Sequence, residues 1–162
     1  MLVSPMPNWV ILLGFLLGGT LRGMLVGLIV LLISLLFTHM PVHHVGVVFM
    51  MALLAAMVFS LGGLINGVYA KRFDDISFIP TFVLTPLTYL GGVFYSIQQL
   101  PPVWRSVSLF NPVLEMVDTF RFGLLGISDV NVVFGFGLVL VFFVVMFCWA
   151  LFLLHRGTGI KV

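Results

Sequence analysis

The chain has 162 residues, of which 62% are hydrophobic and only 7% are charged, and its mean hydropathy is +1.29. A soluble domain carries about a quarter charged residues, so this chain cannot cover a globule with polar surface, and lipid must be the solvent of most of it. The net charge of +2 and the scattered basic residues exclude a nucleic-acid-binding stripe, and the single cysteine, Cys148, excludes an intrachain disulfide.

Four apolar runs are long enough to cross a bilayer, which takes about 20 apolar residues. They are residues 9–37, 46–70, 76–97 and 131–154. The segment between the last two runs is broken by charges and prolines, so residues 101–127 predict one or two short helices that lie on the membrane or dip into it. The expected fold is an all-α integral membrane protein: one domain over 1–162, with four transmembrane helices and short re-entrant or interfacial helices between spans three and four.

The positions of Lys and Arg predict the orientation of these spans, because short basic loops face the cytoplasm. A charged turn joins the second and third runs and contains Lys71, Arg72, Asp74 and Asp75. Arg156 and Lys161 follow the fourth run. Both regions are therefore expected to be cytoplasmic, and so is the N-terminus.

The first run contains small residues at a spacing of four, which lets helices approach closely in lipid. Its candidate packing face consists of Gly19, Arg22, Gly23 and Gly27. Arg22 has two interpretations. It is a functional residue in the packed interior, because an arginine within the membrane is costly, or its side chain extends to the headgroups.

Polar side chains in the third run recur at helical spacing, so one face of that helix is polar. The face consists of Ser77, Thr81, Thr85, Thr88, Gly92 and Tyr95. Pro80 and Pro86 are predicted to kink the helix, since proline removes a backbone donor. Such a face lines a pathway or a subunit interface, or else its hydroxyl groups simply bond to their own helix.

The segment after Pro112 carries Glu115, Asp118 and Arg121, for which a local Asp118–Arg121 pair on a surface helix is the simplest interpretation. A second polar group, His39, His43 and His44, has no carboxylate beside it and is weak evidence for a metal. The sequence contains no catalytic constellation and no phosphate-binding loop. We therefore expect no enzymatic activity, bound cofactor or metal in this chain.

Three stretches resemble the ABC type-2 permeases, the membrane subunits of bacterial ATP-driven exporters for drugs, lipo-oligosaccharides and related amphiphiles. The stretches are LVSPMPNWVILLGFLLGGTLRG, FSLGGLINGVYAKRFDDISFIPTFVLTPLTYLGGVFYS and LPPVWRSVSLFNPVLEMVDTFRFGLLG, and they cover most of the chain in the family's order. The four runs correspond to the C-terminal four of the family's six spans. The family's first two spans and its cytoplasmic coupling helix are then missing from this sequence.

The resemblance implies a permease subunit that dimerises and moves an amphiphilic substrate out across the bacterial inner membrane, while a separate ATPase subunit uses the ATP. It places the polar face of the third run along the translocation path and the 101–127 segment on the outer side. Pro112 and Arg121 fit the family pattern there, whereas Glu115 departs from it. The alternative function is a truncated, non-transporting membrane protein or scaffold derived from such a permease. A channel or proton-coupled carrier is disfavoured, because no carboxylate lies within a predicted span.

Overall fold

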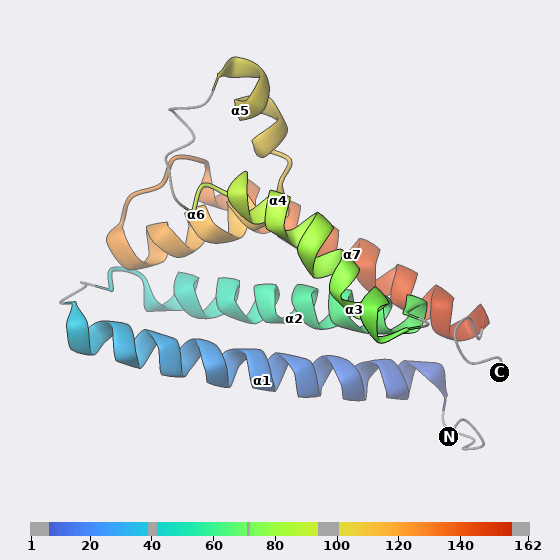
Figure 1. Cartoon of the computed structure of the whole chain (residues 1–162). Coiled ribbons are helices and arrows are strands. Elements are labelled where there is room, and N and C mark those ends of the chain that lie inside the picture. Colours follow the sequence, from blue (N-terminus) through green and yellow to red (C-terminus); the bar gives the residue numbers. More distant parts are fainter. Residues whose placement is uncertain (1–6, 39–41, 71, 94–100, 157–162) are drawn as a thin grey trace.

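The computed structural model describes residues 7–38, 42–70, 72–93 and 101–156, and within these ranges the ordered elements are all helices (Figure 1). In chain order they are α1 (Asn8–Phe37), α2 (Val45–Tyr69), α3 (Phe73–Ile79), the π-helix η1 (Pro80–Leu84), α4 (Thr85–Tyr89), α5 (Pro102–Ser108), α6 (Pro112–Leu125) and α7 (Val132–Arg156). The all-α prediction is confirmed.

Three of these helices, α1, α2 and α7, are long and apolar enough to cross a membrane. They form the body of the molecule, with α2 packed against both α1 and α7 (Figure 1). The Asn8 side-chain amide donates to the carbonyl oxygen of Leu154 at 3.2 Å, so the start of α1 and the end of α7 lie at the same end of this bundle. Three of the four predicted spans therefore have a helix of sufficient length.

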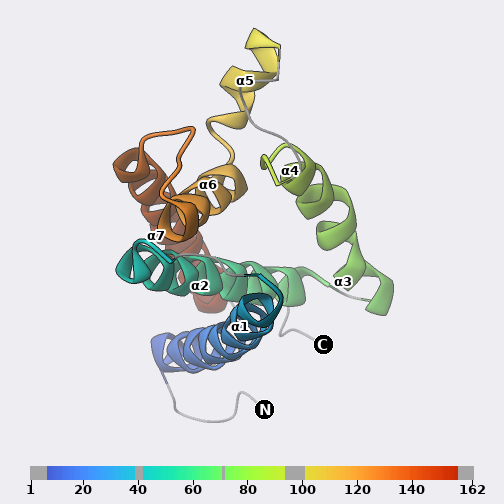
Figure 2. The same ribbon diagram turned by 90° about the vertical axis from the view of Figure 1, so that its left-hand side faces the viewer.

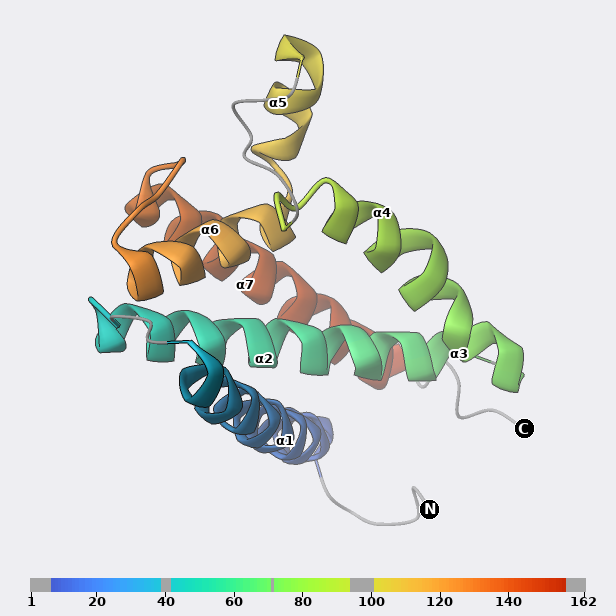
Figure 3. The same cartoon turned by 60° about the vertical axis from the view of Figure 1, so that its left-hand side comes forward.

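The predicted span 76–97 is the exception, because it is divided into the consecutive pieces α3, η1 and α4, and gives way to a turn after Tyr89. The change of helix type begins at Pro80, which has no N–H to donate. Within η1 the Thr85 N–H bonds to the Pro80 carbonyl, five residues back, which is the spacing of a π-turn. A fourth spanning helix is therefore not shown. The chain nevertheless leaves the end of α2 through this kinked helix and runs back toward α6 (Figure 3).

Two short helices occupy the 101–127 segment, as predicted, and each begins at a proline, where the missing N–H costs nothing. Asn111 caps α6 by accepting from the Val113 N–H at 3.0 Å, and α6 ends at Gly126, whose φ of 73° favours glycine. Helix α6 packs on α2 and α7, whereas α5 projects away from the bundle (Figure 2). Whether these helices enter the membrane stays a prediction.

Two apolar clusters hold the helices together, and α2 takes part in both. One joins α1, α2 and α7 around Leu12, Leu61 and Ala150. The other joins α2, α6 and α7 around Met51 and Val139. Helix α2 is thus the central element on which the other helices are positioned.

The contact between α1 and α2 depends on two of the predicted glycines. A Cβ at Gly19 would overlap Ser60, and a Cβ at Gly23 would lie 3.1 Å from that of Ala56. The Ser60 hydroxyl also donates to the Phe15 carbonyl at 3.3 Å, so the helices are joined where they are closest. A Cβ at Gly27, in contrast, would meet nothing within 4 Å.

Gly19→Ala should therefore destabilise the protein by about 1–3 kcal/mol, because the added methyl group overpacks the contact. Gly27→Ala is the matched control and should be neutral or slightly stabilising, since alanine favours helix more than glycine does. Thermal unfolding of both variants in detergent, followed by tryptophan fluorescence, measures the difference. Equal melting temperatures would mean that the close contact at Gly19 does not hold the helices together.

Candidate functional site

The predicted polar face lies on the kinked helix formed by α3, η1 and α4, and much of it is open. Ser77, Thr81 and Thr85 are exposed, Thr88 is half-buried and Gly92 is buried. Tyr95 lies outside the described residues. No residue of η1 or α4 is buried, so neighbouring helices leave the middle of this helix uncovered.

Two of the hydroxyl groups on this face bond to their own helix. Thr85 Oγ1 donates to the Pro80 carbonyl at 3.2 Å, and Thr88 Oγ1 donates to the Thr85 carbonyl at 2.8 Å. This is the arrangement that the simpler interpretation predicted. A hydroxyl oxygen that donates still has free lone pairs, so these threonines remain able to accept a hydrogen bond from a ligand.

The Asn66 side chain satisfies a carbonyl group that Pro80 leaves without a helical donor. Since proline has no N–H, the Ile76 carbonyl, four residues before Pro80, cannot form the usual α-helical bond. Asn66 Nδ2 donates to this oxygen at 2.8 Å from the end of α2. Asn66 is only 8% exposed, so its amide serves this contact rather than solvent.

Two further side chains, one from α6 and one from the residue that caps it, bind carbonyl groups at the end of the kinked helix. Asn111 Nδ2 donates to the Leu87 carbonyl at 2.7 Å, and Arg121 Nη2 donates to the Gly92 carbonyl at 2.8 Å. Helix ends leave such carbonyls without internal partners. The kinked helix is thus anchored to α2 at its start and to α6 at its end.

Sequence reasoning missed the roles of Asn66 and Asn111, although both left a signal. Asn66 is a lone amide near the end of the uncharged run 46–70, and such a residue in an apolar helix usually has a specific partner. Asn111 immediately precedes Pro112, and asparagine before a proline at the first helical position is typical of a helix N-cap. Neither signal identifies the carbonyl that each side chain binds.

The predicted charged trio on α6 separates into two parts. The Asp118 carboxylate accepts hydrogen bonds from the backbone N–H groups of Asp129 and Val130, each at 3.0 Å, and from the Ser128 hydroxyl at 2.6 Å. Asp118 therefore stabilises the loop that leads into α7. Arg121 lies 3.3 Å from Asp129 and 3.8 Å from Asp118. The expected local pair is therefore present, but it belongs to a larger network.

Glu115, the remaining residue of the predicted trio, is only 1% exposed and lies where α6 meets α7. A Cβ placed at Gly135 would lie 2.9 Å from Glu115 Oε2 and 2.8 Å from Thr119 Oγ1, so a side chain there would require Glu115 and Thr119 to move. Glu115 Oε1 has no hydrogen-bond partner in the described part of the chain. Burial, and to a smaller extent the negative charge of Asp118, raises the pKa of the Glu115 carboxyl to about 7.

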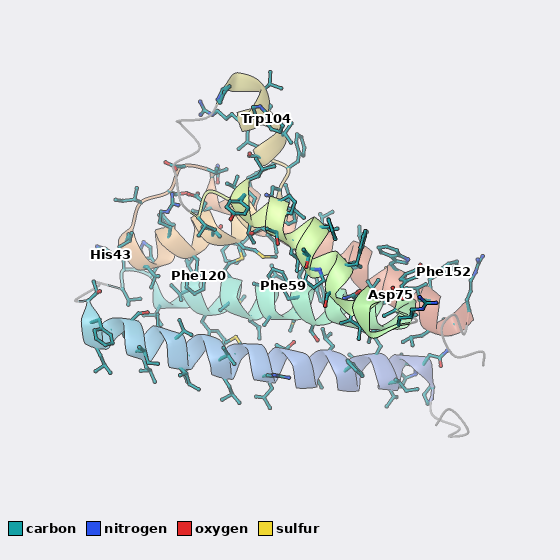
Figure 4. All side chains as sticks on the ribbon, in the orientation of Figure 1. His43, Phe59, Asp75, Trp104, Phe120 and Phe152 are labelled. Atoms are coloured by element: carbon teal, nitrogen blue, oxygen red, sulfur yellow. The ribbon has the colours of Figure 1, made fainter. Side chains whose placement is uncertain are left out.

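Arg22 lies on an apolar groove of about 700 Å³ between α1 and α2. Phe59 and Phe120, both labelled in Figure 4, belong to the walls of this groove. The Arg22 side chain is exposed, and it forms no hydrogen bond or ion pair with another described residue. It is therefore not enclosed by the α1–α2 contact, and both interpretations of this residue stay predictions.

The remaining predicted groups are only partly described. Arg72 donates its backbone N–H to Asp75 Oδ2 at 2.9 Å at the start of α3, while Lys71 and the Asp74 side chain lie outside the described residues. His43 Nδ1 lies 3.3 Å from the Leu124 carbonyl. The described residues contain no cluster of three metal-ligating side chains. His39 lies outside the described residues.

Comparison with known proteins identifies the family. Residues 1–125 match the family model described as ABC-2 type transporter. The chain belongs to this family. It is also 51% identical over 163 residues to the inner membrane transport permease YadH of Escherichia coli strain K12, covering 99% of this chain and 63% of that protein.

Nodulation protein J of Rhizobium leguminosarum biovar viciae is 27% identical over 116 residues, which is 70% of this chain and 45% of that protein. Nodulation protein J of Rhizobium meliloti is 28% identical over 103 residues, 64% of this chain and 39% of that protein. No solved structure matches the chain. The predicted resemblance is confirmed, and together with the three long apolar helices it makes the chain a multi-pass membrane protein of a transport family.

Replacing Asn66 should test whether it compensates for Pro80. Asn66→Leu should cost about 1–3 kcal/mol of stability, because the Ile76 carbonyl then loses its donor. Pro80→Ala restores a backbone N–H to that carbonyl, so Asn66→Leu should cost clearly less in the Pro80→Ala background. Thermal unfolding of the wild type, the two single variants and the double variant gives the coupling between the residues. An equal cost in both backgrounds would contradict this compensation.

Proposed function

We propose that this chain forms the membrane part of a permease subunit of an ATP-driven exporter in the bacterial inner membrane. In this proposal an amphiphilic substrate moves outward along the polar face of the α3–η1–α4 helix. Membership of the ABC-2 type transporter family supports it, and so does the 51% identity to a protein named as an inner membrane transport permease. The chain spans 63% of that relative's length, so transport by the whole protein is a proposal.

The observation that carries this assignment is the open face of the kinked helix. Its backbone is fixed at both ends by Asn66 and Arg121, yet Thr81 and Thr85 remain exposed between these anchors. Large apolar side chains share the helix, including Phe78 and Phe82, whose ring centroids are 4.8 Å apart. Uncharged hydroxyl groups beside aromatic rings suit a substrate that has both a polar and an apolar part.

The proposal includes two partners. A second copy of the permease facing the α3–η1–α4 helix would enclose the path, and a separate ATPase subunit would supply the energy, because the sequence contains no nucleotide-binding loop. Both termini are proposed to be cytoplasmic. The charged turn at residues 71–75 then faces the ATPase side, where Arg72 and Asp75 are exposed.

Thr85→Val tests the path in the full-length protein reconstituted with its ATPase. Valine retains the shape of threonine but lacks the hydroxyl, so the efflux rate of an amphiphilic dye from vesicles should fall several-fold. Val83→Leu is the matched control on the same exposed helix and should preserve the rate. The measurement is dye transport at equal amounts of inserted protein.

Unchanged transport in a Thr81→Val/Thr85→Val double variant would contradict the path assignment and leave the hydroxyl groups with their bonds to the helix. Purification of the native-locus protein without any ATPase, together with absence of transport, would instead support the non-transporting scaffold. The two results distinguish an incorrect path from an incorrect function.

A further inference from the structure

Glu115 is a buried carboxyl that the transport path does not use. It is the only glutamate in the chain, and it faces Gly135 of α7, where the missing side chain leaves room for the carboxyl. Thr119, one turn later on α6, faces the same glycine. Both side chains are 1% exposed, so water does not reach the carboxyl as the helices are packed.

Within the described parts of the chain, no ion pair joins Glu115 to a basic side chain. Arg121, the cation on α6, is engaged by Asp118, Asp129 and the Gly92 carbonyl. Asp118, the charged residue that acts on Glu115, is itself negative and disfavours a second negative charge nearby.

The elements packed against α6 carry few titratable side chains. In α2 the only titratable side chain is Tyr69, at the far end, and in α4 it is Tyr89. In α7 they are Cys148, His155 and Arg156, all in the half distant from Gly135. His43 and His44 contact the C-terminal end of α6, through the Leu124 carbonyl and the Phe122 ring.

We propose that Glu115 is a proton-binding site, in which the protonated carboxylic acid lets α6 pack against α7 at Gly135 and loss of the proton loosens this contact. An ionised carboxylate without donors is strongly disfavoured inside a protein, whereas the neutral acid is tolerated. Arg121 of α6 and the N-cap residue Asn111 hold the end of the kinked helix. Loosening α6 therefore changes the support of the proposed transport path.

The direction of the pH effect follows from the pKa of Glu115, which is raised above the ordinary value of 4.5 to about 7. Between these two pH values the folded protein keeps a proton that the unfolded chain releases. Stability due to this proton is fully present below about 4.5 and is lost as the pH rises toward about 7. Above that pH the carboxylate is ionised in both states, and the loss is complete.

Infrared spectroscopy can test the site without any substitution. Because the chain contains one glutamate, carboxyl-¹³C labelling of glutamate marks the Glu115 band alone. In lipid vesicles the labelled chain should show the carbonyl stretch of a protonated acid at pH 6, and this band should disappear around pH 7. A band already absent at pH 6, or a midpoint at the ordinary carboxyl pKa, would overturn the proposal.

Thermal unfolding tests the consequence for the α6–α7 contact. Glu115→Gln resembles the protonated acid, so its advantage in melting temperature over the wild type should grow from pH 5 to pH 7 and then stay constant. Asp75→Asn makes the same chemical change at an exposed carboxyl and should show no such growth. The same comparison in a His43→Gln/His44→Gln background excludes any contribution of the two neighbouring histidines. If the difference in melting temperature between Glu115 and Glu115→Gln is the same at all pH values, Glu115 is not the proposed proton-binding site. Neither measurement involves transport, so either can fail independently of the proposed exporter function.

Discussion

A backbone polar group that is buried away from water must find a hydrogen-bond partner, because leaving it unpaired costs free energy. The α3–η1–α4 helix violates this condition where Pro80 deprives the Ile76 carbonyl of its donor. The structure restores it from outside, with Asn66 on the preceding helix. In this structure the donor at the kink is an amide on the neighbouring helix α2.

The same constraint explains the position of α6. This short helix lies against α2 and α7 through apolar contacts around Met116 and Val139. From that base it presents Asn111 and Arg121 to the carbonyl groups at the end of the kinked helix. Helix α6 and its N-cap thus join the bundle to the helix that carries the polar face. Glu115 lies where α6 contacts α7.

Anchoring at the ends also accounts for what remains open in the middle. Asn66, Asn111 and Arg121 bind carbonyl groups near the two ends of the helix. The helix then needs few side-chain contacts, and η1 and α4 contain no buried residue. The hydroxyl groups of Thr81 and Thr85 stay on the surface as a result. A polar face held in this way is available to a substrate or to a second copy of the chain.

The sequence by itself determined the membrane class, the helical fold, the family, the positions of the three long apolar helices and the two breaks before α5 and α6, because these depend on local composition, proline chemistry and recognisable stretches. It also predicted a shared face for the threonines and a packing role for the glycines spaced by four. The tertiary structure alone decided that Gly19 and Gly23 contact α2 while Gly27 does not. It also decided that Glu115 lies against Gly135 of α7, whereas Asp118 and Arg121 bind the loop that leads into α7. These outcomes depend on which helices meet and at what height, and residue spacing within one helix carries no information about the neighbour that its side chains will meet.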